Sequence, residues 1–85
     1  MTTKNDIYYH ACTEKDERFI MDVCLDPFNA RLRVDDYRGD VRAMHSRILE
    51  LVEQHSFTKV FIKSRQEDWQ TFLSLGYMLE GVYKK

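Results

Sequence analysis

The pattern of apolar residues predicts a β-strand in each of two neighbouring stretches of the chain. The first is rich in β-forming residues that share one face, and the second alternates apolar and charged residues. In residues 18–25 every second residue is apolar: Phe19, Met21, Val23 and Leu25. Residues 30–35 repeat the pattern with charged residues on the other side, and the predicted inward positions are Ala30, Leu32 and Val34. A period of two is typical of a strand with one buried face.

The four residues between these stretches predict a tight turn. Asp26 is suited to the first turn position, Pro27 has its φ angle already set for the second, and Asn29 tolerates the left-handed region. The two strands are therefore predicted to form an antiparallel hairpin.

The period of the pattern changes to that of a helix after Asp40. Asp40 is a suitable N-cap, and the predicted helix ends at about Ser56. Stepping 100° per residue gathers one apolar stripe, with Leu49 and Leu51 on its flanks: Val41, Met44, His45, Ile48 and Val52. A stripe this wide predicts a helix packed on a sheet.

The remainder of the chain predicts a strand, a helix and a last strand. Residues 58–63 have an apolar middle with lysines towards the ends, so this strand should pair in parallel with residues 30–35. Residues 67–75 predict a helix that Gly76 ends, and its inner face is Trp69, Phe72 and Leu73. Residues 77–83 predict the last strand. The order β-β-α-β-α-β predicts an α/β fold, a single small two-layer sandwich with a mixed sheet and two helices.

The first 17 residues are predicted to be a separate N-terminal segment. Tyr8 and Tyr9 form an edge strand or belong to a partly disordered stretch, and the charged residues 13–17 form a solvated loop. The folded domain is then expected over residues 18–85.

Composition narrows the classes of function. The chain has 85 residues with 13 basic and 14 acidic side chains, a net charge of -1, which disfavours nucleic acid as a partner. No apolar run is long enough to cross a membrane, and the N-terminus does not resemble a signal peptide. We therefore expect a cytoplasmic protein. Cys12 and Cys24 do not form a disulfide framework, Cys24 is expected to be a buried small apolar residue, and the spacing of cysteines and histidines predicts no metal site.

One local arrangement can carry chemistry. A strand that ends at Asp36, followed by a helix that begins near Val41, directs free backbone N–H groups and the positive end of a helix dipole at one point. Anions bind at such points, and Arg38 and Arg42 add positive charge. The alternative is that the Asp40 side chain caps the helix and fills the site itself. His45 and Tyr77 are candidates for a general base by their chemistry alone.

The same residues resemble a known superfamily. The strand, Tyr37-Arg38-Gly39, helix and strand are similar to the acetyl-CoA motif of the GNAT N-acetyltransferases, and residues 69–81 (WQTFLSLGYMLEG) are similar to the close of many GNAT chains. More narrowly, residues 25–29 (LDPFN), 31–34 (RLRV) and 36–40 (DYRGD) resemble the N-terminal region of the β-lysine N-acetyltransferases, which are implied to acetylate β-lysine. The resemblance covers about residues 18–83.

The resemblance implies a GNAT-like fold and a pyrophosphate loop for acetyl-CoA formed by Arg38, Gly39, Arg42 and Ala43. Val41 stands where the family has the middle glycine, and a Cβ there hinders the approach of a phosphate. In that family a second acetyltransferase domain follows this region, and we expect these 85 residues to correspond to the region before it. We therefore expect a GNAT-like domain that is non-catalytic by itself and serves packing or dimerisation, with a second copy or a following acetyltransferase domain as partner. The alternative is a small acetyl-CoA-dependent N-acetyltransferase that acts on an amine.

Overall fold

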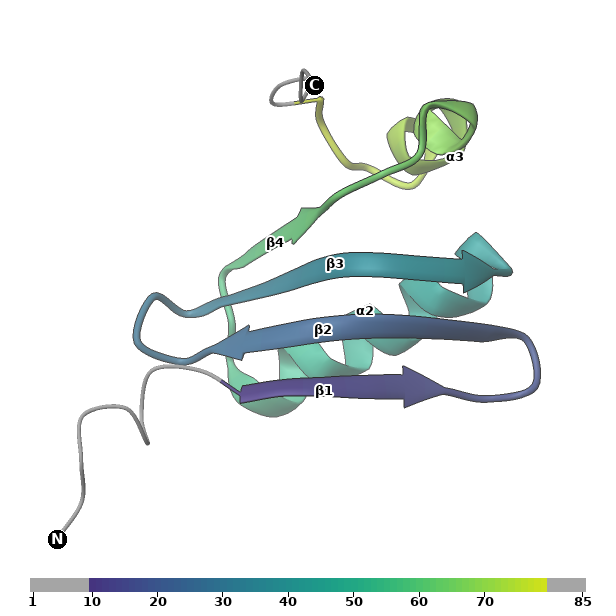
Figure 1. Ribbon diagram of the computed structural model, residues 1–85. Helices are drawn as coiled ribbons and strands as arrows, with labels where there is room; N and C mark the ends of the chain where they lie inside the picture. The colour runs from purple at the N-terminus through teal and green to yellow at the C-terminus, as the bar shows by residue number, and fades with distance from the viewer. Residues whose placement is uncertain (1–9, 80–85) are drawn as a thin grey trace, which may run out of the picture.

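Four strands form one mixed sheet in the order β1-β2-β3-β4 in the computed structural model, which describes residues 10–79 (Figure 1). The strands are β1 (His10–Lys15), β2 (Phe19–Asp26), β3 (Arg31–Gly39) and β4 (Lys59–Ile62). The helices are α2 (Val41–His55), the 3-10 turn η1 (Gln66–Asp68) and α3 (Trp69–Ser74). The chain is thus a small α/β domain, as the sequence predicts.

The predicted hairpin is confirmed, with β2 and β3 antiparallel. Its turn differs by one position from the prediction, because Ala30 N–H donates to the carbonyl of Pro27 and Ala30, not Asn29, takes the positive φ of 54°. The buried carboxylate of Asp26 accepts from the backbone and side-chain N–H groups of Asn29 and from Nε of Arg31. These bonds fix the turn, and Ala30 is a turn residue rather than the first inward residue of β3.

A bulge in β3 changes which residues face the core. Val34 lies opposite Val23 and Asp36 lies opposite Asp22, which leaves Asp35 as an extra residue on β3. An extra residue shifts the alternation by one. Tyr37 therefore points inward and is only 4 % exposed, where the sequence predicts the end of the strand pattern.

The N-terminal prediction is wrong in one respect. Residues 13–15 belong to β1, which pairs antiparallel with β2, and are not part of a solvated loop. The side chain of Arg47 in α2 bonds to Glu14 at 2.8 Å, so β1 is also held by the helix. The predicted strand at Tyr8 and Tyr9 lies outside the described residues.

The helix α2 packs on one face of the sheet and forms the core with it (Figure 1). It begins after the N-cap Asp40 and ends at His55 with Ser56 as its C-cap, which agrees with the predicted end at about Ser56. Leu51 is buried, whereas Leu49 is 53 % exposed. The largest fully buried side chains come from β2, β3 and α2: Met21, Val23, Leu32, Val34, Met44 and Ile48.

The strand β4 pairs in parallel with the first half of β3, which confirms the predicted β-α-β order. The pairing covers Arg31 to Val34 of β3 and no residue beyond the bulge. The chain then continues through η1 and α3, which lies beyond the β4 edge of the sheet (Figure 1). Residues 77–79 are not a strand, and the rest of the predicted last strand lies outside the described residues.

Candidate functional site

The start of α2 is the predicted anion site, and the carboxylate of Asp40 already occupies it. Asp40 Oδ1 accepts from the backbone N–H of Arg42 at 3.0 Å and of Ala43 at 3.2 Å. These are amides that would otherwise be free to meet a bound anion. The structure therefore agrees with the alternative in which the Asp40 side chain caps the helix and fills the site itself.

The other predicted loop residues point in different directions. Gly39 has a φ of +106°, and a Cβ built on it would lie 2.4 Å from the carbonyl oxygen of Arg18. Its small size is thus required by the neighbouring chain at the start of β2. Ala43 is buried, and Arg38 and Arg42 are exposed. Of these four residues only Arg38 lines the shallow hollow between β2 and β3, and none lines the groove beside β4, both of which are described below.

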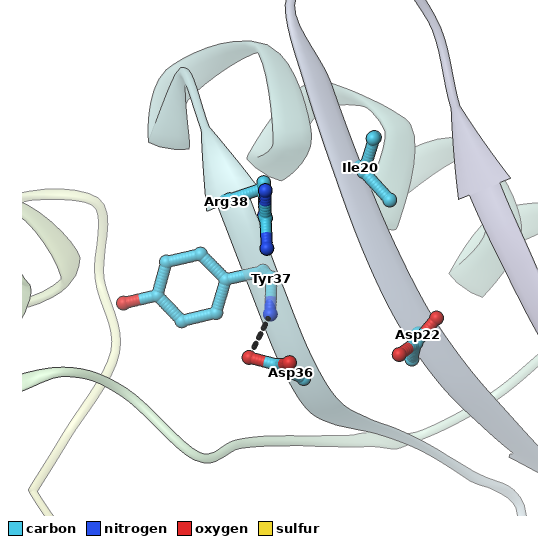
Figure 2. Close-up of a pocket in the computed structure, with 5 residues that line it drawn as sticks. All are labelled: Ile20, Asp22, Asp36, Tyr37 and Arg38. Carbon is cyan, nitrogen blue, oxygen red and sulfur yellow. Dashed lines mark hydrogen bonds between the residues drawn. The ribbon is translucent and has the colours of Figure 1, made fainter.

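A shallow hollow of about 230 Å³ lies on the face of the sheet opposite α2 (Figure 2). Figure 2 shows Ile20 and Asp22 on β2 beside Asp36 and Arg38 on β3, with the ring of Tyr37 directed away from them. Asp36 accepts from the backbone N–H of Tyr37 at 2.8 Å, and Asp22 accepts from Thr13 at 3.0 Å. Since both carboxylates already have partners within the sheet, the hollow has the features of a solvated strand surface.

The inward side chain of Tyr37 joins β3 to η1. Its hydroxyl donates to Asp68 and accepts from the backbone N–H of Arg65 at 3.0 Å. The guanidinium of Arg65 lies over the ring, 4.8 Å from its centre. Burial raises the pKa of Tyr37, and the hydrogen bond to Asp68 raises it further. These contacts tie the loop after β4 and the start of η1 to the second half of β3.

The structure brings His45 and Tyr77 together, although they are 32 residues apart. His45 Nδ1 lies 2.9 Å from the Tyr77 hydroxyl, and their rings meet edge to face. Burial lowers the pKa of His45, and the charge of Arg42 lowers it further. Burial raises the pKa of Tyr77 to about 12. With these shifts the pair is a neutral hydrogen bond near pH 7, which fastens the chain after α3 to α2.

A second and larger hollow than the one beside Asp22 and Asp36 is a groove of about 1140 Å³ along the outer side of β4. One wall is β4 with the start of the following loop, and the other is formed by η1, α3 and residues 76–79. The second wall presents large apolar side chains, several of them exposed: Leu73 at 47 %, Met78 at 81 % and Leu79 at 54 %. We call this feature the β4 groove.

Some backbone N–H and C=O groups of β4 point into the groove, away from β3. Lys59 N–H donates to the Ala30 carbonyl and Lys63 N–H donates to the Val34 carbonyl. Alternate residues of a strand direct their backbone groups to opposite sides, so Val60 and Ile62 direct theirs away from β3. Among the described residues no strand pairs with that side.

The charges that line the β4 groove are all positive. Arg31, Arg33 and Lys63 are lining residues, and no aspartate or glutamate is among them. Arg31 binds Asp26 at 3.0 Å and Arg33 binds Asp35 at 3.1 Å, in each case through Nε. The terminal NH₂ groups of Arg31 and Arg33 are therefore not used in these two ion pairs.

Sequence patterns could not place this groove, because it depends on where α3 lies relative to β4. The sequence gives one sign of it, since residues 58–63 have an apolar middle with lysines near both ends. Lysines commonly protect an edge strand from pairing with other chains.

Neither the cysteines nor a cluster of metal ligands provides a further candidate site within residues 10–79. Cys24 is buried as predicted, Cys12 is exposed, and both thiols are free. Partial burial and the nearby charge of Glu14 raise the pKa of Cys12, which disfavours the reactive thiolate. No group of three or more potential metal ligands gathers within residues 10–79. In the same part of the chain no helix combines the length and apolar character that a bilayer crossing requires.

Comparison of the chain with family models, with curated proteins and with solved structures finds no match. The function proposed below is therefore inferred from the contacts and exposed surfaces of residues 10–79.

Proposed function

We propose that this chain is a non-catalytic, GNAT-like domain of the β-lysine N-acetyltransferase kind that acts by packing against another polypeptide. The partner is a second copy of the chain or an acetyltransferase domain. The observation that carries the proposal is the β4 groove, where an edge strand whose outer side pairs with no strand within residues 10–79 faces a wall of exposed apolar side chains. Such an edge is a surface for pairing with another chain.

The β3-α2-β4 unit supports the GNAT-like part of the proposal. It has the parallel strand, helix and strand that the resemblance implies, and Arg38 and Gly39 end the first strand just before the helix. The bulge in β3 is followed by a stretch that no longer pairs with β4.

The cap of α2 supports the non-catalytic part. A bound pyrophosphate would need the amides that Asp40 holds, and it would meet the negative charge of that carboxylate. Val41, at the position of the family's middle glycine, adds a Cβ on the same turn.

The alternative function, a small acetyl-CoA-dependent N-acetyltransferase, is favoured by the contact between His45 and Tyr77. A neutral imidazole is the form that can accept a proton from an amine. The two functions make opposite predictions for acetyl-CoA binding.

The deciding experiment is a titration of isotope-labelled protein with acetyl-CoA, followed by the backbone amide NMR signals. We expect no shift of residues 38–44 at millimolar coenzyme, and no amine-dependent release of thiol with β-lysine or polyamines. The matched control is Asp40→Asn, which keeps a capping oxygen and removes the negative charge. Saturating shifts in the natural protein, together with amine-dependent thiol release, would overturn the proposal in favour of the enzyme.

Light scattering over a range of concentrations identifies the partner. A mass above 10.2 kDa that rises with concentration assigns packing to a second copy. A constant monomer mass excludes dimerisation and leaves another polypeptide as the partner.

A further inference from the structure

We propose that β4 binds an extended segment of a partner protein as an added strand, and that this segment has apolar residues in its middle and acidic residues at its ends. The inference rests on the proposed function and names the chemistry of the partner.

The backbone of β4 specifies an extended ligand. Val60 and Ile62 offer two N–H and two C=O groups on the side that faces the groove, as the bonds of Lys59 and Lys63 to β3 require. Only another strand can satisfy alternate donors and acceptors in this row. Helical or compact ligands satisfy their own backbone groups and would leave these unpaired.

The side walls specify apolar residues in the middle of the ligand. The wall opposite β4 presents Leu73, Met78 and Leu79, which are all at least 47 % exposed. Side chains of an added strand point alternately to its two faces. Apolar residues at every second position would therefore cover this wall and remove its area from water.

The charges specify acidic residues at the ends of the ligand. Arg31 lies beside Lys59 at the start of β4, and Lys63 follows its end. Both line the groove together with Arg33, which lies beside Phe61, and no carboxylate is among the lining residues. Lys63 lies 4.0 Å from Asp35, which also pairs with Arg33. The ion pairs of the two arginines engage Nε, so each guanidinium has further N–H groups for a second carboxylate. An acidic flank would thus be attracted, and a basic one repelled.

The charges of β4 and of the last residues disfavour two other occupants, a second copy paired about Phe61 and residues 80–85. If two copies paired through β4 in the antiparallel sense about Phe61, Lys59 of each copy would lie opposite Lys63 of the other, and like charges across a sheet destabilise it. Residues 80–85 of the chain carry one glutamate and two lysines, so this segment lacks the required negative charge.

The experiment uses two synthetic peptides with the same apolar centre, Val-Ser-Ile-Ser-Val, and either two glutamates or two lysines at each end. Each peptide is titrated into the labelled chain at low salt while the amide signals are recorded. We expect the glutamate peptide to shift Val60, Ile62 and residues 73–79, and to bind at least about fivefold more tightly than the lysine peptide.

Two variants separate edge pairing from a simple apolar contact. Val60→Pro removes an N–H that faces the groove and leaves the bonds from Lys59 and Lys63 to β3, as proline is tolerated on edge strands. It should weaken the glutamate peptide about tenfold, whereas Val60→Ala, which keeps the N–H, should weaken it much less. An unchanged amide spectrum in the rest of each variant shows that it has folded.

Several results would overturn the inference. Equal binding of both peptides would remove the acidic specificity, and equal loss in the two variants would remove strand addition. Slow hydrogen exchange of Val60 and Ile62 in the free monomer would show that the chain's own segment occupies the edge. Self-association that Val60→Pro abolishes would assign it to a second copy. Such self-association would overturn this inference but agree with the proposed function. Amine-dependent acetyl transfer would instead overturn the proposed function.

Discussion

Gly39 shows how one residue can fit a functional motif and yet be required for a structural reason. Its φ is +106°, and a Cβ there would lie 2.4 Å from the Arg18 carbonyl oxygen and 2.8 Å from Phe19 Cα. The next residue, Asp40, donates its backbone N–H to the same Arg18 carbonyl at 2.8 Å. The glycine therefore permits the close contact between the end of β3 and the start of β2.

We expect Gly39→Ala to lower the free energy of unfolding by about 2–4 kcal/mol, because backbone strain and a backbone clash add. The control is Gly76→Ala, which has a similar φ of +103° but no atom within 4 Å of the added Cβ, and which should cost about 1 kcal/mol. Urea unfolding measures both. Equal costs would show that the contact with Arg18 is unimportant.

His45 gives a prediction of pH dependence at the same scale. Burial and Arg42 lower its pKa below the ordinary value of 6.5, so below that pH the unfolded chain binds the extra proton more readily than the folded one. The stability from this histidine is therefore present above pH 6.5 and lost as the pH falls through the folded pKa. His45→Gln should show a shallower fall in unfolding free energy between about pH 7 and pH 5. An identical pH profile in the variant would contradict this.

At the scale of elements, α2 is the best-predicted part of the chain because its signals are local. Its N-cap lies next to it in sequence, and its apolar stripe repeats over four turns with the helical period. The strand β1 is the opposite case. Its residues are mostly exposed, so no buried apolar alternation marks it. It forms because β2 offers an edge for pairing and Arg47 of α2 forms an ion pair with Glu14.

The N-cap of α2, Asp40, gives a prediction about stability at the scale of elements. Asp40→Ala should lower the free energy of unfolding by about 1 kcal/mol, since the amides of Arg42 and Ala43 lose their acceptor. Asp40→Asn should retain nearly all of the stability, because its side-chain oxygen accepts the same bonds. Thermal unfolding followed by circular dichroism measures the difference. A fully stable alanine variant would argue that the cap does not hold the helix.

At the scale of the whole molecule, one face of α2 against β2 and β3 supplies most of the core. Ile48 is fully buried, whereas the adjacent Leu49 is 53 % exposed. Ile48→Ala should cost about 2–5 kcal/mol, a large part of the stability of a domain of this size. Leu49→Ala removes the same kind of side chain from the surface and should change the stability by less than about 0.5 kcal/mol. Chemical denaturation of both variants is the measurement, and a small loss for Ile48→Ala would contradict the packing.

The sequence alone determined the features that depend on neighbours along the chain. Periodicity, capping residues and turn residues within a few positions predict the β2–β3 hairpin, the limits of α2 and the parallel pairing of β3 with β4. They also predict that α3 ends shortly before Gly76. The candidate anion site was also found there, since it needs only a strand, a loop and a helix start in order.

Only the tertiary structure decided the features that depend on contacts between distant segments. The bulge at Asp35 turned Tyr37 inward, where the partners of its hydroxyl lie at Arg65 and Asp68. The contact of His45 with Tyr77 and the β4 groove both require α3 and the chain after it to lie beside the sheet. No local period encodes such a placement, because it is fixed by which side chains are buried when the elements pack together.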